Sequence, residues 1–413
     1  MSFPKMARFR QSFAADTVSD VQAAVVSQLR ACDMAGRIKP GQRIAVTGGS
    51  RGIANISAIT RIVVDAVRAA GGVPFVMPAM GSHGGATAQG QKEVLASYGL
   101  GELEMGCPVE ATMEVVELGQ LQDGTPIVVN RLAHEADGVV VINRVKPHTS
   151  FRGSHESGVV KMLTIGLGCH RGATMAHAQG AQGLARLIPA LGEALLARLN
   201  VVGGIALVEN AYDRTASVTA LRPEEILSKE PQLLAEARVN MPRILAHNID
   251  LLIVDEMGKN ISGTGMDTNV IGRMMLPGVK EPDEPGVARI FVRRLSDTTH
   301  GNANGVGLSD VITKQLFDSI DFEATYANAF TSTFLNRAYI PIIKADDREA
   351  IASMFEVLRI DDGATARVAR IINTIDVEHI QLSESLARTS DHPDLTQVGE
   401  FGDMCFDADG ALV

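Results

Sequence analysis

The first half of the chain alternates short β-branched runs with segments whose apolar residues recur at helical spacing. Residues 43–46 predict a strand, residues 57–70 predict an amphipathic helix that ends at two glycines, and residues 73–77 predict the next strand. Strands that alternate with helices of this length indicate βαβ units and a mostly parallel sheet. Ligands of open α/β sheets bind at the carboxyl ends of the strands. The polar turns that follow these strands are therefore the first candidates for a functional site.

A polar helical segment separates this half from a second one with the same alternation. Because 413 residues exceed one ordinary core, we predict an α/β protein of two α/β domains, with mostly parallel sheets and an active-site cleft between the domains. The expected boundaries are residues 1–225 for an N-terminal catalytic and cofactor-binding domain, 226–248 for a helical connector and 249–413 for a C-terminal domain. The further strands expected are 126–130, 138–142, 204–208, 250–255, 288–292 and 340–343, and the further helices are 86–97, 308–320 and 348–358.

The composition restricts the classes of partner. The formal net charge of −10 argues against nucleic acid, because phosphate backbones are bound by clustered Lys and Arg. The chain has no apolar stretch of about 20 residues and no signal-peptide pattern, so we expect no membrane partner. The four cysteines lie far apart and form no CxxC, which fits reduced thiols. We expect a cytoplasmic protein with a small-molecule partner, and the sequence leaves a homodimer open.

A glycine-rich turn, residues 47–54 (TGGSRGIA), follows the first predicted strand and precedes a helix. It is similar to the TGxxxGIG cofactor loop of short-chain dehydrogenases. Those enzymes also need a Tyr followed four residues later by Lys, and none of the four tyrosines meets this condition. Backbone N–H groups at such a turn bind anions in any protein. We therefore expect Gly49, Ser50 and the permanent cation Arg51 to hold a phosphate or a carboxylate; a tight turn with a surface arginine is the alternative.

Residues 144–179 hold four of the ten histidines of the chain. Histidine titrates near neutral pH and is the commonest metal ligand, so this density points to proton transfer or metal binding. His148 follows a predicted strand, and so does His83 in the turn 81–85 (GSHGG). Two histidines at strand ends of one sheet can remove a proton on one face of a ligand and return it on the other. His83 and His148 are therefore the catalytic candidates.

The same stretch contains a lysine in an apolar segment. A charged amine is costly to bury, so Lys161 is expected to be paired, neutral or chemically modified. His177 follows sixteen residues later (177 − 161), in a setting that suits a neutral imidazole and a borderline metal. His155 is expected on a loop, either near the substrate or simply exposed, and His170 at the surface.

Five polar residues, taken in their order and spacing, resemble the nickel-pincer nucleotide-dependent lactate racemase family, with this chain as a divergent member. They are Arg51, His83, His148, Lys161 and His177. The family has Gly-Thr-His-Arg where this chain has residues 81–84 (GSHG), and Ser-Gly-Gly-Arg-Lys where it has residues 157–161 (SGVVK). The resemblance extends over most of the chain and is weaker in the second half.

The resemblance implies a nickel cofactor, the nickel-pincer nucleotide (pyridinium-3,5-bisthiocarboxylic acid mononucleotide), whose two sulfur-bearing arms clasp the metal. By this resemblance Lys161 would hold one arm and His177 would be the protein ligand of nickel. The loop of Gly49, Ser50 and Arg51 would bind the cofactor phosphate, or Arg51 the substrate carboxylate.

The activity implied is that of an isomerase, a racemase or epimerase of a 2-hydroxy acid that works by reversible proton-coupled hydride transfer. His83 and His148 would be its acid/base pair. Val160 precedes the lysine where the family has Arg, and thirteen residues separate His148 from Lys161 (161 − 148), more than in the family. A cofactor held without a covalent bond is therefore the alternative to a tether through Lys161.

In the second half, residues 255–258 (DEMG) and 267–269 (DTN) look like a segment of the family. The Gln and Lys that place substrate in that family are replaced by Gly272 and Met275. The sequence therefore does not identify which 2-hydroxy acid is the substrate. The expected substrate-binding residues are Arg51, Lys259, Asn269 and Arg273, with Lys314 as another cation that would replace the lost one.

Two other functions remain open from the residues alone. The histidines could form a zinc or iron site for a lyase or hydrolase, although no HExxH spacing is present. The glycine-rich loop could instead serve a non-catalytic protein that binds an anionic metabolite.

Overall fold

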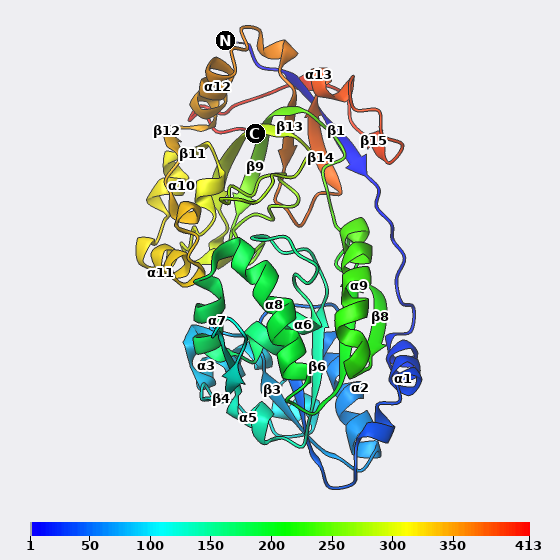
Figure 1. The fold of residues 1–413 in the computed structure, drawn as a ribbon. Coiled ribbons are helices and arrows are strands. Elements are labelled where there is room, and N and C mark those ends of the chain that lie inside the picture. The colour runs from blue at the N-terminus through cyan, green and yellow to red at the C-terminus, as the bar shows by residue number, and fades with distance from the viewer. Residues whose placement is uncertain (1) are drawn as a thin grey trace. The chain divides into compact units, whose positions relative to one another are not determined.

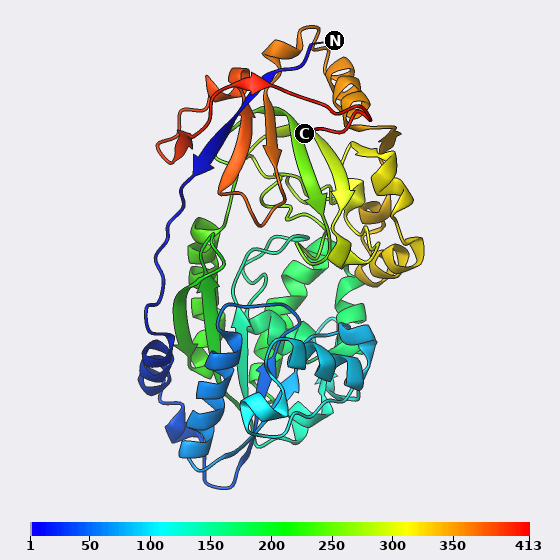
Figure 2. The ribbon, with the colours of Figure 1, turned by 180° about the vertical axis from the view of Figure 1, so that it is seen from behind.

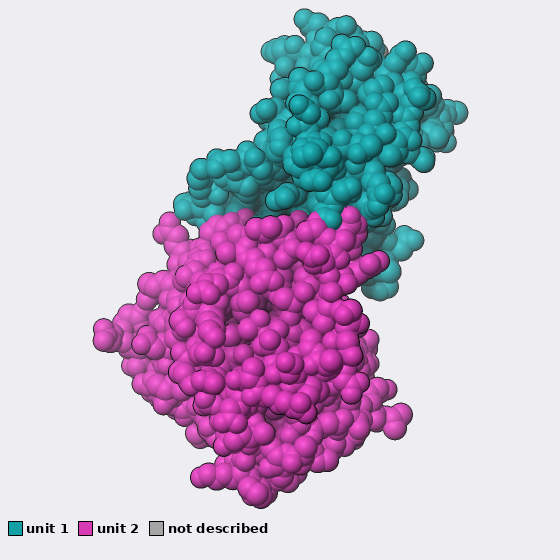
Figure 3. Space-filling view, turned by 90° about the vertical axis from the view of Figure 1, so that its right-hand side faces the viewer, with its two compact units in different colours: residues 1–13, 242–413 teal, residues 14–241 magenta. Residues whose placement is uncertain are grey.

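The structure is a computed structural model and describes residues 2–413. It is an α/β protein with two compact units, each built on its own sheet (Figures 1 and 2). Unit 2 comprises Ala14–Met241, and unit 1 comprises Pro242–Val413 together with the residues up to Phe13 (Figure 3). The α/β class and the mostly parallel sheets expected from the sequence are confirmed.

The sheet of unit 2 runs in the order β3-β2-β6-β7-β8. Its first four members are parallel and β8 pairs antiparallel with β7. The parallel strands are nearly continuous buried apolar runs, as expected for strands covered on both faces. The strands are β2 (Arg43–Gly48), β3 (Val73–Pro78), β6 (Gly138–Arg144), β7 (Val201–Glu209) and β8 (Thr215–Leu221).

Helices cover both faces of this sheet, with α8 and α9 on the face seen in Figure 1 and α2 on the face seen in Figure 2. Helix α2 forms because its apolar residues recur every three or four positions and make one buried stripe. The helices of unit 2 are α1 (Val21–Ala31), α2 (Ile56–Ala69), α3 (Ala88–Ser97), α4 (Glu102–Met105), α5 (Arg131–Glu135), α6 (Val159–Lys161), α7 (Cys169–His177), α8 (Gly180–Leu196) and α9 (Ile226–Asn240).

The sheet of unit 1 runs in the order β12-β11-β10-β9-β13-β14-β1-β15, and β16 also pairs with β1. The strands from β12 to β13 are parallel, whereas β14, β1, β15 and β16 are antiparallel to their neighbours. These strands are β1 (Lys5–Gln11), β9 (Ile249–Met257), β10 (Val287–Leu295), β11 (Val311–Thr313), β12 (Ile342–Lys344), β13 (Val368–Ile371), β14 (His379–Ser383), β15 (Leu395–Gln397) and β16 (Gly402–Asp403).

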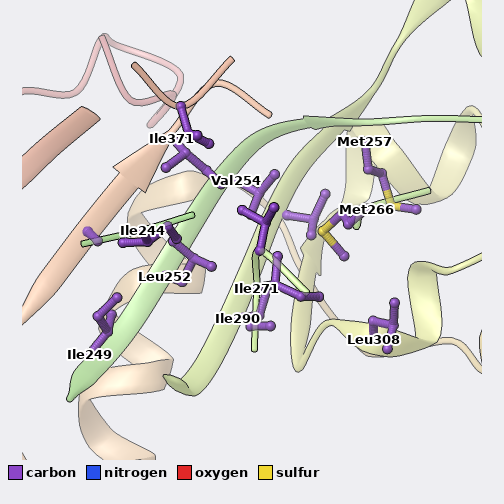
Figure 4. Close-up of a cluster of buried hydrophobic side chains, with 14 of the residues drawn as sticks. Ile244, Ile249, Leu252, Val254, Met257, Met266, Ile271, Ile290, Leu308 and Ile371 are labelled. Carbon is purple, nitrogen blue, oxygen red and sulfur yellow. The ribbon is translucent and has the colours of Figure 1, made fainter. Parts of the chain in front are cut away.

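The helices of unit 1 are short and join the strands of the sheet. They are α10 (Lys314–Asp318), α11 (Phe322–Ser332), α12 (Asp347–Val357) and α13 (Glu384–Ala387). One face of β9 and β10 packs against the loop residues Met266, Ile271 and Leu308 in an aliphatic core (Figure 4). The unit therefore has a hydrophobic core of its own.

Four features differ from the sequence prediction. Strand β1 belongs to the sheet of unit 1, although the first residues were expected in the N-terminal domain. Residues 308–320 were expected as one helix, but they contain β11 before α10. The strand expected at 126–130 is β5 (Pro126–Asn130), which pairs with β4 (Val115–Gln120) in a separate hairpin.

The fourth difference concerns the expected connector. Helix α9 packs on β7 and belongs to unit 2. No helix within residues 2–413 is long and apolar enough to cross a membrane.

Candidate active site

Three neighbouring parallel strands of unit 2 end beside one another and deliver three of the predicted side chains. Strand β2 leads to the turn with Arg51, β3 leads to the turn with His83, and β6 leads to His148. Because β2 lies between β3 and β6, the two histidines come from strands on either side of the glycine-rich turn. This is the carboxyl edge of the sheet, where open α/β sheets bind ligands.

The glycine-rich turn lies close to the segment that carries Lys161. A methyl group added at Gly49 would come within 3.1 Å of the Cε atom of Met162, so a larger residue would press on that segment. The hydroxyl group of Tyr98 donates to the Ser50 carbonyl over 3.3 Å. Arg51 is exposed as a residue, and loss of hydration lowers the pKa of its guanidinium.

The turn that carries His83 packs against the same segment. The Gly81 N–H donates to the Gly166 carbonyl over 3.0 Å, and the buried Gln91 side chain donates to the Gly81 carbonyl over 2.9 Å. Gly81 has a φ of +60°, where a residue with Cβ would be strained. His83 itself is exposed, and its Nδ1 atom lies 2.8 Å from the Met80 carbonyl.

His148 lies on a closed loop, residues 146–157, which we call the His148 loop. Its two ends pair through backbone hydrogen bonds of 2.9 and 3.2 Å between Lys146 and Ser157. Ser150 donates its N–H to Nδ1 of His148 over 3.0 Å, and the Phe151 ring packs 4.4 Å from the imidazole, centroid to centroid. The ring of His148 is therefore held from two sides.

A buried carboxylate holds the His148 loop from within. Glu156 is 1% exposed and accepts the N–H of His148 over 2.7 Å and that of Gly153 over 3.1 Å. Arg238 of helix α9 donates to the other side of this carboxylate over 2.6 Å, and Arg152 lies 3.7 Å away. The position of His148 thus depends on an ion pair with a helix distant in sequence.

His155 has a structural role that differs from the expected place at the substrate. It is 5% exposed, and both ring nitrogens are engaged, with the Ser154 hydroxyl at 3.0 Å and the Leu227 carbonyl at 2.9 Å. These bonds fasten the His148 loop to α9. His170 is exposed in the first turn of α7, as expected.

Lys161 and His177 lie on one nearly continuous helical segment. Lys161 ends α6, a π-helical turn follows at Met162–Gly166, and α7 ends at His177. Such π-helical turns occur frequently at functional sites. The carboxylate of Glu230 on α9 accepts the N–H of Val160 over 3.0 Å, and so fixes the start of the segment.

The charges around Lys161 show which groups share the site. Loss of hydration, followed by the nearby charges of Arg51 and Lys146, lowers the pKa of Lys161 to about 8, and Glu156 opposes this shift. Burial, with the charge of Lys161, lowers the pKa of His177 to about 4. Burial also holds the pKa of His148 well below its usual value, assisted first by Lys161 and His177. Half of the Lys161 population is therefore the neutral amine near pH 8.

The structure brings together Arg51, His148, Lys161 and His177, and the packing of its turn on the Lys161 segment brings His83 to the same edge. It adds Lys146, a cation that sequence reasoning did not select. Its position four residues after the predicted strand 138–142, two before His148, was the signal that would have found it.

The supporting residues of α9 were also missed. Leu227, Glu230, Leu234 and Arg238 are spaced by three or four positions and share one face of the helix. The position of Glu230 between two leucines on this face was the sequence signal that its carboxylate binds a group inside the unit. Its partner, the Val160 N–H, is seventy residues away and has no sequence signature.

The residues of the second half that were expected to bind substrate lie in unit 1, and their contacts are within that unit. Lys259 donates to the Gly263 carbonyl over 2.8 Å, and Asn269 donates to Asp267 over 2.7 Å, both in the loop after β9. Arg273 is ion-paired with Asp310 at 2.6 Å and donates to two backbone carbonyls. Its donors are used inside unit 1, which favours a structural role.

No group of three or more His, Cys, Asp or Glu side chains within residues 2–413 is arranged to hold a metal ion. A zinc or iron ion held by the protein alone needs at least three such ligands. The site residues therefore do not support that alternative. The buried cysteine nearest the site, Cys169, has a raised pKa because of burial, so it is not an activated thiolate.

One family of known proteins matches part of the sequence. Residues 8–185 match the model of the lactate racemase N-terminal domain. The match contains Arg51, His83, His148, Lys161 and His177. This match supports an isomerase of the racemase class.

Among solved structures, the chain is similar to the lactate racemase apoprotein from Thermoanaerobacterium thermosaccharolyticum. The identity is 14%, the alignment covers 87% of this chain and 95% of that one, and the TM-score is 0.47. No curated protein matches the sequence.

Proposed function

We propose that the protein racemises or epimerises a 2-hydroxy acid with a nickel-pincer nucleotide. The observation that carries this proposal is the carboxyl edge of the unit 2 sheet. There two histidines from flanking strands accompany Lys161 and His177, which lie on one helical segment. The match to the lactate racemase N-terminal domain supports the reaction class.

The residues present fit the cofactor. His177 is half-buried and its lowered pKa keeps the imidazole neutral, the form that binds a metal. A single protein ligand suffices only where the cofactor supplies the other ligands, as a pincer does. The amine of Lys161, with a pKa of about 8, is the group that would hold one arm.

The cations match the charge of the cofactor and substrate. Arg51 and Lys146 both act on Lys161 electrostatically, so positive charge is concentrated at this edge. Gly49, Ser50 and Arg51 would hold the cofactor phosphate, with Arg51 also available to the substrate carboxylate. From unit 1, Lys259 and Asn269 remain the candidates for contacting substrate, since Arg273 is held by Asp310.

When bound, the cofactor supplies the acceptor for the hydrogen on C2 of the substrate. The protein holds the hydroxy acid by its carboxylate and moves the proton of its hydroxyl group. His83 and His148 are the groups proposed to handle that proton, because each presents an imidazole at the end of a strand.

The test is to express the full chain with and without enzymes that synthesise the cofactor, then measure nickel content and isomerisation of a panel of 2-hydroxy acids. We expect nickel binding and activity only with the cofactor. Activity without it, restored by zinc alone, would contradict the proposal. His177→Ala should lose nickel, whereas the exposed His170→Ala, the matched control on the same helix, should retain it.

Intact-mass spectrometry of the same protein examines the tether. We expect an added mass that disappears in Lys161→Met and persists in Lys146→Met. An unmodified chain that still contains nickel and nucleotide would show that the cofactor is held without a covalent bond. This result would contradict the bond to Lys161 and would leave the proposed reaction standing.

A further inference from the structure

One buried arginine of unit 1, Arg337, carries a guanidinium with no bound acceptor. It lies in a 3₁₀ turn at Leu335–Ala338 and is 1% exposed. Its Nε, Nη1 and Nη2 atoms have no hydrogen-bond partner within residues 2–413. An arginine, unlike a lysine, keeps its charge when it is buried. The positive charge of Arg337 therefore persists in the interior, where a charge is costly unless it is paired.

Two arginines of the unit 1 sheet show the usual arrangement. The side chains of Arg293 and Arg370 are also largely buried, and each binds a carboxylate oxygen of Asp255 at 2.9 Å. Planar guanidinium groups bind carboxylates strongly, because two parallel N–H groups match the two oxygens. A carboxylate is thus the group that the side chain of Arg337 needs.

The acidic residue whose charge acts on Arg337 does not meet this need. Loss of hydration lowers the pKa of Arg337 to about 10, and the charge of Glu281 opposes this shift. The carboxylate of Glu281, however, accepts the backbone N–H of Met274 over 2.5 Å and that of Met275 over 2.7 Å. Glu281 is exposed and is used to hold its own loop. The guanidinium therefore stays positive at neutral pH and its donors remain available.

The turn that carries Arg337 lies at the surface of unit 1. Leu335 and Tyr339 are 48% and 64% exposed. On its inner side, the Arg337 carbonyl accepts the N–H of Gly305 over 2.8 Å, in the loop that leads to Leu308 of the core (Figure 4). A small molecule can therefore reach the guanidinium through local movement of the turn, without opening of the sheet.

We propose that Arg337 binds the carboxylate group of a small monocarboxylic acid within unit 1. One negative charge neutralises the guanidinium, whereas a phosphate dianion or a dicarboxylate would bring a second charge that is left buried and unpaired. The bound acid would also fasten the turn to the loop at Gly305. The proposal does not depend on the proposed function, because it uses no group of unit 2 and no cofactor.

Hydrogen–deuterium exchange of the full chain, measured by mass spectrometry, tests the site without activity. The reporters are peptides that contain the N–H groups of Gly305 and Arg337. Sodium acetate and sodium lactate are compared with sodium chloride and sodium phosphate at equal ionic strength. A carboxylate at about ten times its Kd should slow exchange of these peptides by about tenfold, because the turn opens only after the carboxylate leaves.

The probes distinguish the possible sources of the carboxylate. Equal protection by acetate and lactate supports a site for monocarboxylates in general, and protection by lactate alone supports a site for 2-hydroxy acids. Protection by phosphate alone, or the same exchange with all four salts, overturns the proposal. These comparisons use the unaltered chain, so they remain decisive if a variant fails to fold.

Variants locate the effect at the guanidinium. Arg337→Met keeps a long apolar side chain and should lose the protection by acetate, with exchange in chloride no faster than in the unaltered chain, since an unpaired buried charge has been removed. Arg388→Met removes an exposed arginine of the same unit and should keep the protection in full. Protection that persists in Arg337→Met, or much faster exchange of that variant in chloride, overturns the assignment.

Discussion

Charged side chains gather in both units, but they act differently: in unit 1 arginines form ion pairs with buried carboxylates, and in unit 2 neighbouring cations lower the pKa of a lysine. In unit 1, the strand residues Arg293 and Arg370 both bind Asp255 at 2.9 Å, and Arg293 also binds Asp347 at 2.7 Å. In unit 2, Arg51 and Lys146 surround Lys161, whose pKa falls to about 8. Paired buried charges hold a fold together, whereas gathered cations disfavour one another and favour an anionic ligand.

The contrast is tested most strongly by removing an arginine from the cluster around Asp255 in unit 1. Arg293→Met leaves the buried carboxylates of Asp255 and Asp347 without this partner, so the free energy of unfolding should fall by about 3–5 kcal/mol. Urea unfolding measures it. Arg388→Met, which removes a mostly exposed pair with Glu384, is the control and should cost less than about 1 kcal/mol. Equal losses in the two variants would contradict the structural role of the cluster.

In the cation cluster of unit 2, loss of a charge is expected to reduce activity and not stability. Lys161→Met should reduce kcat/KM by about 10²-fold or more, because a misplaced cofactor misplaces the reacting atoms. Its thermal midpoint should stay unchanged or rise, since an unfavourable positive charge has been removed. The control is Lys314→Met, an exposed pair with Asp318, which should alter neither quantity. A large fall in the midpoint of Lys161→Met would show that Lys161 is structural.

The pH dependence of stability provides a third contrast, at the residue that caps the Lys161 segment. Burial raises the pKa of Glu230 to about 7, so the folded state binds more protons than the unfolded state between pH 4.5 and pH 7. Stability should therefore fall as the pH rises through this window. Glu230→Gln keeps an acceptor for Val160 and removes the charge, so it should gain about 2 kcal/mol at pH 8 and little at pH 4. Chemical unfolding at both pH values is the measurement, and an equal effect at both would refute this account.

The smallest effect is expected at the carboxylate beneath the His148 loop. Glu156→Gln loses the ion pair with Arg238 and retains one acceptor oxygen, so we expect a loss of about 1 kcal/mol in stability. The activity of the holoenzyme should fall as well, since the His148 loop loses its ion-paired support from Arg238. Glu193→Gln, an exposed residue of α8, is the matched control for both measurements. Unchanged activity in Glu156→Gln would remove its positioning role.

Much of unit 2 was predictable because its signals are local. The strands near residues 43–46, 73–77 and 138–142 occur as β2, β3 and β6, and the turns after them carry Arg51, His83 and His148. A buried parallel strand is a continuous apolar run, which is visible in any sequence. The order of the strands was not visible, because it depends on pairing between distant residues.

The failures arose where short elements depend on distant partners. Strand β1 pairs with β14 more than 350 residues away, and the three residues of β11 are a strand only because β10 and β12 flank them. Within the histidine stretch, the sequence predicted His155 on a loop, near the substrate or exposed. The structure shows it buried, because the Leu227 carbonyl of α9 binds its ring.

The sequence by itself determined which chemical groups arrive at the carboxyl edge of the unit 2 sheet, because a strand, its turn and the next helix are contiguous in the chain. The order and spacing of those groups also predicted the similarity to lactate racemases, and residues 8–185 match the model of the lactate racemase N-terminal domain. Only the tertiary structure decided the state of each group. The lowered pKa of Lys161 and the support from Glu156 and Glu230 come from burial and from hydrogen bonds between segments distant in sequence. Such effects act through space, so no local pattern records them.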